Sequence, residues 1–511
     1  MNLKTVTHLI AVLMIMEGIA MALTAGVSLL MKDSLNTVLT ILGCGVFTSL
    51  LGLLTAILTK PRPGQKLQTG LREGFATVAG GWLIASIFGT LPFVMETGLW
   101  WHDAFFETVS GFTTTGSSVI DSTLKLMDGS TLPKGVESLS CGILFWRSMI
   151  QWIGGMGIVV LSLAILPMLG VGGQAIFNAE VPGVKTQDDQ LTPKIASTAK
   201  ILFVVYFAMT VLETLFLWFG GMTFFDAVCH SFTTLATGGF STKSDSIAYY
   251  KSSYIQVVIT IFMFLAGCNF ILHYRIFTGM PLRQYLSEEF RFFAFMMVGA
   301  TLIIATSLFF SDITDPMSGD RYHMAPWLSI RAAMFQVVTL ATTTGFGTAD
   351  YTLWPTSCGM ILIGVMFMGA CGGSTAGGIK CVRVMLLGKF CTSELRRCIF
   401  PRSLQDIRLN GKRVETPVLN KALGFLLIYI MTFFLFALIL PMVCKMDLVT
   451  ALSASLTSIS NVGPGFGQIS PVQTFAWMNI PAKLLLSLEM LIGRLELYTM
   501  LVIFLSSFWK K

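Results

Sequence analysis

Charged side chains are scarce in this sequence. Lys, Arg, Asp and Glu together make up 12% of the 511 residues, whereas a soluble domain carries about 25%. This scarcity excludes a soluble enzyme, a disordered tail and a secreted disulfide scaffold. Hydrophobic residues make up 54% of the chain, with 40 Phe, 29 Met and 48 Gly, and the mean hydropathy is +0.74. Such a composition is typical of packed, lipid-facing helices, and it predicts an integral membrane protein.

Motifs for metal, disulfide or nucleotide chemistry are also missing. The ten cysteines form no CxxC pair and mostly lie in apolar segments, which argues against a metal site and a disulfide framework. The five histidines show no HExxH or similar spacing, and no GxxxxGK[ST] sequence is present. A membrane-embedded enzyme would need a clustered nucleophile and base, or metal ligands at depth. We therefore expect neither an enzyme nor a bound cofactor or transition metal.

Apolar stretches about 20 residues long, the length that crosses a bilayer, occur ten times. They run near residues 8–31, 36–59, 72–95, 138–169, 198–220, 254–278, 290–311, 354–384, 420–443 and 475–508. Four shorter apolar runs begin near Trp101, Phe224, Trp327 and Lys445. Because these runs are too short to cross a bilayer, they predict re-entrant segments or buried half-helices.

Basic residues predict the orientation of the helices. The segments 60–72, 170–200, 275–291 and 383–421, together with the two termini, hold 22 of the 34 Lys and Arg residues. By the positive-inside rule these segments and both termini are cytoplasmic, and the short runs enter from the outer face. The most basic segment, 383–421, is either a solvated loop or a docking surface for a cytosolic partner or anionic lipid.

The four short runs and the loops after them form an internal repeat. In each, an Ala stands twelve residues before a Gly, and a hydroxyl residue stands six residues before the same Gly. These positions are Ala104, Ser110 and Gly116; Ala227, Thr233 and Gly239; Ala333, Thr339 and Gly345; and Ala451, Thr457 and Gly463. The glycines recur at intervals of 106 to 123 residues, each time between two full-length spans.

This repeat has the chemistry of a cation site. A half-helix that stops in mid-membrane turns the negative end of its dipole toward the centre. The chain that follows offers carbonyl and Thr oxygens, which can replace the hydration shell of an alkali cation. Glycine permits the positive φ that aims successive carbonyls inward. One such stretch alone would favour an ordinary small-residue packing surface, but four in register predict a selectivity filter.

The predicted fold is an all-α polytopic membrane protein with about ten transmembrane helices. Four pseudo-symmetric M1–P–M2 repeats (helix, half-helix, helix) surround a central pore, and an N-terminal helix hairpin precedes them. We assign the hairpin to residues 1–60, the four repeats to residues 71–170, 198–280, 289–384 and 420–511, and a basic cytoplasmic loop to residues 385–419.

The sequence from Thr343 to Gly347, TTGFG, resembles the potassium-channel filter TVGYG. A single chain with four degenerate repeats resembles the Trk/Ktr/HKT superfamily of potassium transporters, and the extra hairpin makes it more similar to the bacterial TrkH/TrkG branch than to KtrB. The resemblance covers nearly the whole chain. It implies a constriction formed by each filter glycine and the residues just before it. These are Thr114, Thr115 and Gly116; Thr237, Gly238 and Gly239; Thr343, Thr344 and Gly345; and Asn461, Val462 and Gly463. Whether Gly238 or Gly239 lines the filter is left open.

The resemblance also implies a gate below the filter, where a loop breaks the second helix of the third repeat. Residues 369–378 contain five glycines, each costing a helix about 1 kcal/mol relative to Ala. The alternative is a kink that eases packing. The predicted gate residues are Gly372, Gly373, Ser374, Gly377, Gly378, Lys380 and Arg494.

Arg494 lies inside the last span, and the resemblance makes it an electrostatic barrier in the pore. The alternative is a buried ion pair with Glu489 or Glu496. We expect the other intramembrane charges, Arg147, Glu17 and Glu213, to be paired.

The function that the resemblance implies is potassium uptake across the inner membrane of a bacterium, with some rubidium and less sodium passing through the same pore. Glycine in all four loops favours potassium. The alternative is a potassium–proton or potassium–sodium symporter; proton coupling usually needs an Asp, Glu or His relay, and Glu107 and His230 lie nearest the loops. The resemblance further implies a homodimer, contact with membrane lipid and a cytosolic regulatory ring of TrkA type that senses nucleotide. No nucleic-acid partner is expected.

Overall fold

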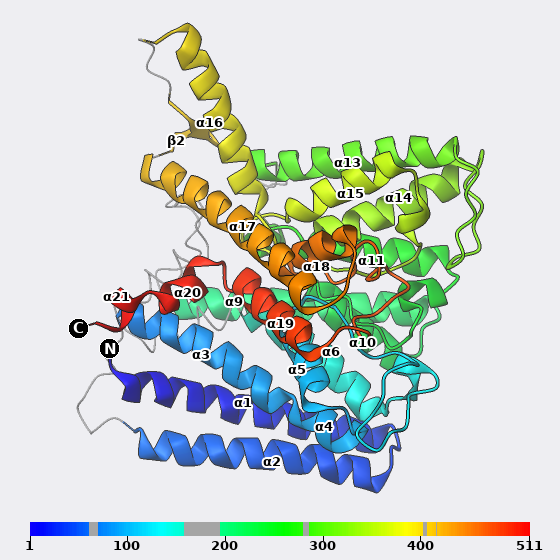
Figure 1. The fold of residues 1–511 in the computed structure, drawn as a ribbon, viewed down its shortest axis with the longest axis vertical. Coiled ribbons are helices and arrows are strands. Elements are labelled where there is room, and N and C mark those ends of the chain that lie inside the picture. The colour runs from blue at the N-terminus through cyan, green and yellow to red at the C-terminus, as the bar shows by residue number, and fades with distance from the viewer. Residues whose placement is uncertain (61–69, 158–194, 280–285, 402–405, 415, 511) are drawn as a thin grey trace.

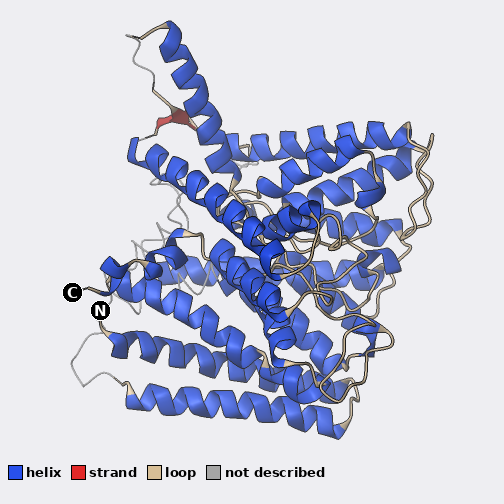
Figure 2. Ribbon diagram, viewed as in Figure 1, coloured by secondary structure: helices blue, strands red, loops and turns tan. Residues whose placement is uncertain are grey.

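The computed structural model describes residues 1–60, 70–157, 195–279, 286–401, 406–414 and 416–510. Helices and the loops between them make up almost all of this part of the chain (Figure 2). The named strands within it are a short antiparallel hairpin, β1 (Arg408–Leu409) and β2 (Lys412–Arg413). The all-α class expected from the sequence is confirmed.

The N-terminal hairpin consists of α1 (Leu3–Leu30) and α2 (Leu35–Leu58), which lie side by side at the edge of the bundle (Figure 1). Small residues let the two backbones approach closely. A Cβ atom built on Gly45 would lie 2.7 Å from the carbonyl oxygen of Gly18 and 3.0 Å from the Cβ of Met21. Close packing through small residues is a common way to hold membrane helices together, because lipid provides no hydrophobic driving force between them.

Each of the four repeats opens with a long apolar helix. These are α3 (Leu71–Gly89) continued by α4 (Leu91–Thr97), α9 (Ile195–Phe219), α13 (Glu288–Phe309) and α17 (Thr416–Val443). The break before α4 is explained by Pro92, which lies in its first turn and lacks a backbone N–H. With α1 and α2, these make six continuous spans of sufficient length and hydropathy within the described residues.

Four half-helices are buried over most of their length: α5 (Trp101–Phe112), α10 (Phe224–Leu235), α14 (Pro326–Ala341) and α18 (Leu448–Ser460). They begin close to the positions predicted from the sequence. Every residue of α5 from Asp103 onward is buried, although several of them are polar. The four predicted M1–P–M2 repeats are confirmed.

The second helices of the repeats are shorter than the first. They are α6 (Cys141–Met156); α11 (Ser253–Ala266) and α12 (Phe270–Phe277); α15 (Thr356–Phe367) and α16 (Cys381–Ile399); and α19 (Ile480–Arg494) and α20 (Tyr498–Leu501). The first pair is bent by 101°. The spans expected over 254–278, 354–384 and 475–508 are therefore interrupted, and the end of the span expected over 138–169 lies outside the described residues.

Helix α16 projects away from the bundle, with the β1–β2 hairpin beside it (Figure 1). Part of the segment predicted as a basic loop, residues 385–399, is thus the end of a helix. Its inner face packs Val382 and Leu386 against Leu409 of the hairpin. A short helix, α21 (Ser506–Trp509), ends the chain, and both termini lie together at one side of the molecule.

The contact between α1 and α2 generates a stability prediction. Gly45→Val should lower the free energy of unfolding by about 1–3 kcal/mol, because the new side chain overlaps the backbone of α1. The measurement is the melting temperature of the detergent-solubilised protein. Gly43→Val is the matched control, since a Cβ at Gly43 meets nothing within 4 Å; equal melting temperatures for the two variants would contradict the packing described here.

Candidate functional site

The four half-helices end in the same turn. In each, the residue two positions before the repeated glycine has a left-handed backbone and the following N–H donates back into the helix. In the first repeat, Thr114 has φ 51°, and Thr115 N donates to Ser110 O at 2.8 Å. The equivalent bonds join Gly238 to Thr233, Thr344 to Thr339 and Val462 to Thr457, at 2.8–2.9 Å. This is the six-residue bond of a Schellman motif, which satisfies one of the carbonyls left open at a helix end.

The hydroxyl residue that recurs six positions before each ring glycine therefore contributes its backbone carbonyl to the turn. It is the last-turn residue whose carbonyl accepts the bond that closes the turn. The left-handed residues are themselves unusual: Thr114, Thr237, Thr343 and Asn461 have φ between 51° and 55°. Threonine is β-branched and rarely adopts this region, and such outliers concentrate at functional sites.

The register of the second loop is settled by the same geometry. Gly239 has φ +75°, close to Gly116 at +83° and Gly345 at +81°, and Gly463 follows at +102°. Gly238 stands one residue earlier, in the place of Thr115, Thr344 and Val462. The glycine equivalent to the other three is thus Gly239.

The four loops close into a ring. A Cβ atom built on Gly116 would overlap the carbonyl oxygen of Gly238, and one on Gly239 would overlap that of Thr344. The same holds for Gly345 and the Val462 carbonyl, while a Cβ on Gly463 would lie 2.7 Å from the Thr115 carbonyl oxygen. Each loop therefore contacts the next, and the fourth contacts the first. We call residues 114–116, 237–239, 343–345 and 461–463 the four-loop ring; all twelve were predicted as filter residues.

The ring is rich in side-chain oxygen, and all of its residues are buried except Gly116, Gly239 and Gly345, which are partly exposed. Thr114, Thr115, Thr237, Thr343 and Thr344 have no exposed surface. Asn461 joins the fourth loop to the first by donating from Nδ2 to Thr115 Oγ1 at 3.0 Å. Within the described residues, the hydroxyls of Ser110, Thr114 and Thr339 have no hydrogen-bond partner. Buried hydroxyl oxygens without a hydrogen-bond partner are suited to coordinating a cation.

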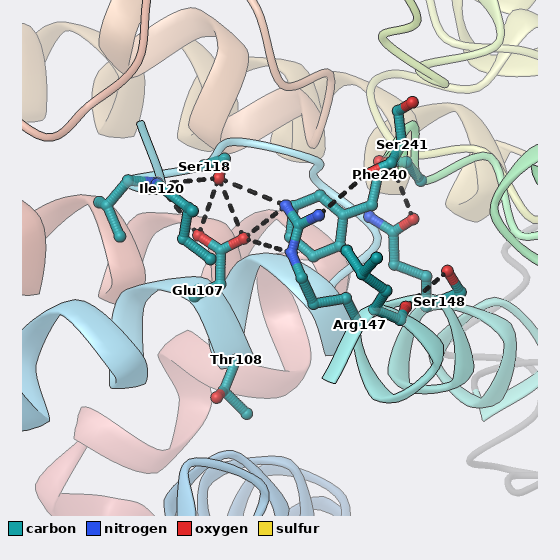
Figure 3. Close-up of polar contacts among 12 residues, drawn as sticks. Glu107, Thr108, Ser118, Ile120, Arg147, Ser148, Phe240 and Ser241 are labelled. Atoms are coloured by element: carbon teal, nitrogen blue, oxygen red, sulfur yellow. Dashed lines mark hydrogen bonds and ion pairs between the residues drawn. The ribbon is translucent and has the colours of Figure 1, made fainter. Parts of the chain in front are cut away.

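The chain that leaves the first loop of the ring is held by a buried ion pair (Figure 3). Arg147 of α6 donates from Nη2 and Nε to Glu107 Oε1 of α5, at 2.7 Å and 2.9 Å. Glu107 also accepts from the backbone N–H of Val119 at 3.0 Å. The expected pairing of Arg147 is confirmed. For Glu17 and Glu213, the described residues show no ion pair, so their pairing stays a prediction.

Three polar side chains that stand nine residues before a ring glycine were not predicted as a group. Glu107 stands there in the first repeat, His230 in the second and Gln336 in the third. His230 Nε2 lies 3.0 Å from Ser241 Oγ, and the Gln336 amide oxygen accepts from Thr348 N at 3.1 Å and from Ala349 N at 3.2 Å. All three contact the chain that leaves the ring. Their common spacing from the glycine was visible in the sequence.

The glycine-rich loop, residues 368–380 between α15 and α16, lies against the ring. Gly377 N donates to Thr343 Oγ1 at 2.8 Å, and Thr375 Oγ1 donates to Leu235 O at 3.0 Å. A Cβ on Gly377 would overlap the carbonyl oxygen of Ser460. This one loop therefore contacts the ends of the second, third and fourth half-helices, and its own residues do not form a regular helix.

The other predicted gate residues hold this loop to its surroundings. Gly372 N donates to Glu289 Oε1 at 2.7 Å, and Phe270 N donates to Gly373 O at 3.2 Å. Ser374 Oγ donates to Cys371 O at 2.6 Å, and Lys380 Nζ donates to Ala376 O. Gly378 has φ +67°. These residues therefore shape the loop, while Thr375 and Gly377 contact the ring.

Arg494, at the end of α19, bridges the glycine-rich loop to another helix. It donates from Nη1 to Thr375 O at 2.6 Å and from Nη2 to Gly154 O of α6 at 3.2 Å. The two carboxylates considered as ion-pair partners have other contacts. Glu489 accepts from Ser455 Oγ at 2.6 Å, and Glu496 pairs with Arg383. Two of the contacts of the Arg494 guanidinium are therefore with backbone carbonyls.

Comparison with known proteins places this arrangement in a family. The model of the TrkH family, described as a cation transport protein, matches residues 45–511. The chain is 36% identical to the Trk system potassium uptake protein TrkH of Salmonella typhimurium over 514 residues, the whole of both chains. It is 32% identical to the Trk system potassium uptake protein TrkG of Escherichia coli K12 over 88% of each. The crystal structure of the potassium transporter TrkH from Vibrio parahaemolyticus superposes with a TM-score of 0.85 at 32% identity, covering all of both chains.

The closed ring generates a prediction for the second loop. Gly239→Ala should destabilise the protein by about 1–3 kcal/mol, because it combines a strained φ with an overlap on the Thr344 carbonyl. Gly347→Ala is the control, since its Cβ would meet nothing nearer than 3.5 Å. Thermal unfolding in detergent measures both. A Gly239 variant as stable as the Gly347 variant would show that the loops do not touch there.

Proposed function

The chain belongs to the TrkH family of cation transport proteins, and we propose that it carries potassium ions across a membrane through the four-loop ring. It is a transport protein rather than an enzyme. The observation that carries the proposal is the cyclic contact of the four loops, in which each ring glycine abuts a backbone carbonyl of the next loop. A closed ring of backbone at membrane depth is the form that a cation filter takes.

Electrostatics support a monovalent cation in this position. Four half-helices end at the ring, and each directs the negative end of its dipole there. The backbone oxygens and threonine hydroxyls of the ring are the ligands that replace water around an alkali cation. The membrane potential supplies about 2.3 kcal/mol per 100 mV for each charge moved inward. Uptake of potassium, with rubidium and less sodium, then needs no further energy source.

The contacts of Glu107 and His230 favour this simple passage over proton symport. Glu107 is engaged by Arg147, Ser118 and Val119. Both imidazole nitrogens of His230 are within hydrogen-bond distance of protein oxygens: Nδ1 lies 2.7 Å from Asp226 O, and Nε2 lies 3.0 Å from Ser241 Oγ. A proton relay needs groups that can exchange partners, and these two are fixed. Potassium flux of the His230→Gln variant should therefore keep the pH dependence of the parent protein.

The glycine-rich loop and Arg494 form the gate in this proposal. The loop lies against the ring, and Arg494 holds it through the Thr375 carbonyl. The guanidinium also repels a cation that has passed the ring. Opening requires the loop to leave the ring, and we assign control of that step to a cytosolic nucleotide-binding ring of TrkA type. We further propose that the protein is a homodimer in the inner membrane with both termini in the cytoplasm. The basic α16 arm then lies on the cytoplasmic side.

Cation flux into proteoliposomes of the purified protein tests the filter. We expect flux of potassium and rubidium to exceed that of sodium and lithium. Gly345→Ser should abolish this preference, because the new side chain overlaps the Val462 carbonyl. Gly347→Ser serves as the control in the same loop. A potassium preference that survives Gly345→Ser in folded protein would remove the ring from the pathway.

The gate is tested by two substitutions of Arg494. Arg494→Gln removes the charge and one of the carbonyl contacts, and basal potassium flux should rise by about tenfold or more, the effect of losing one charge-assisted contact. Arg494→Lys keeps the charge but cannot reach both carbonyls, so it separates repulsion from anchoring. If Arg494→Lys keeps flux near the parent level, then repulsion by the positive charge closes the gate, and anchoring through the carbonyl contacts does not. Unchanged flux in both variants would rule out the gating function of this residue.

A further inference from the structure

Helix α6 holds the second loop with two side chains that stand one turn apart. Gln151 donates from Nε2 to Gly238 O at 2.7 Å and accepts from Phe240 N at 3.1 Å. Arg147 donates from Nη1 to Ser241 O at 3.0 Å, and its guanidinium carbon lies 4.1 Å from the centre of the Phe240 ring. These contacts fix the backbone on both sides of Gly239, the glycine of the ring.

The same arginine reaches the first loop through Glu107. The Glu107 carboxylate accepts from Val119 N at 3.0 Å and from Ser118 Oγ at 3.0 Å, and Arg147 Nη2 lies 3.3 Å from the same hydroxyl (Figure 3). Ser118 and Val119 lie two and three residues beyond Gly116, on the chain that leaves the first loop of the ring. One buried ion pair therefore touches the chain leaving the ring in two successive repeats.

Burial makes this network rigid. Arg147 is 2% exposed, and Glu107 and Gln151 are fully buried. A buried charge that loses its partner is strongly destabilising, so neither group can swing away at low cost. Arginine presents its donors in a planar fork, which fixes the direction of each bond. The relative position of the two loops is thus set by side chains that do not belong to the ring.

We propose that Arg147, Gln151 and Glu107 are positioning residues that set the ion selectivity of the ring at the junction of its first and second loops. This inference rests on the proposed function, because it assumes that cations pass the ring. Discrimination between potassium and sodium depends on the spacing of the ring oxygens. Loosening one junction changes that spacing while the remaining three contacts keep the ring closed.

The test compares rubidium and sodium flux in proteoliposomes. Arg147→Gln should lower the rubidium-to-sodium flux ratio by about tenfold, the effect expected for one lost charge-assisted contact, while total flux persists. Gln151→Ala should lower the ratio by a smaller factor, since it leaves the ion pair intact. Arg147→Lys should give an intermediate ratio, because one ammonium group cannot serve Glu107 and Ser241 together.

A second ion pair on the same half-helix provides a matched control. Asp103, also on α5, pairs with Lys483 of α19 at 2.5 Å, and both side chains are 4% exposed. This pair joins a half-helix to a second helix, as Glu107 and Arg147 do, but it lies one turn nearer the start of α5. Asp103→Asn should cost stability and leave the flux ratio at the parent value.

Three outcomes decide the inference. A reduced ratio in the Arg147 and Gln151 variants, with the parent ratio in Asp103→Asn, supports it. A parent ratio in folded Arg147→Gln and Gln151→Ala overturns it, as does an equal loss in Asp103→Asn. If Arg147→Gln does not fold, Gln151→Ala and Glu107→Gln carry the same test. A parent protein without any preference for rubidium would instead refute the proposed function.

Discussion

A helix that stops inside a bilayer leaves as many as four backbone carbonyls without a partner, in a medium that offers no water. This protein contains four such ends, and they all meet at one place. Bonds from the turn residues satisfy some of these carbonyls, as from Thr343 to Leu340 and from Thr344 to Thr339. The carbonyl oxygens of the loops that follow, such as those of Thr344 and Val462, lie at the contacts between loops. The unmet demand for hydrogen-bond donors or cations is therefore the property from which the proposed transport follows.

Much of the surrounding structure serves to keep those ends in register. Each ring glycine abuts a carbonyl of the next loop, so even one methyl group at any of them would disturb its neighbour. Threonine in a left-handed backbone costs free energy that the surrounding packing must offset. Ion pairs such as that between Glu107 and Arg147 supply part of that support from outside the ring. The glycine-rich loop and the four half-helices pack against the ring and restrict its movement.

The sequence predicted the parts of this arrangement that repeat. Apolar length located the spans, and the spacing between Ala104, Ser110 and Gly116, found four times, located the half-helix ends. The spacing from Ala227 and Thr233 indicated Gly239, but two adjacent glycines carry no information on φ, so the sequence left open which of Gly238 and Gly239 lines the ring. The interruption of the second helices was predicted only where five glycines marked it. The partner of Arg147 lies 40 residues away in the chain, and such a contact depends on tertiary packing that spacing alone does not encode.

The ring is closed by its two most distant members. Asn461 and Thr115 are 346 residues apart in the sequence, as are Ser117 and Gly463. During synthesis, only two of the four junctions have their residues in place while the last repeat is still unmade. A partial ring leaves two loop edges with exposed backbone, and contacts of long sequence separation form late in folding. A tetrameric channel closes by subunit association, whereas this chain must wait for its own C-terminal fifth, so truncation there costs the closed ring as a whole and not a quarter of it.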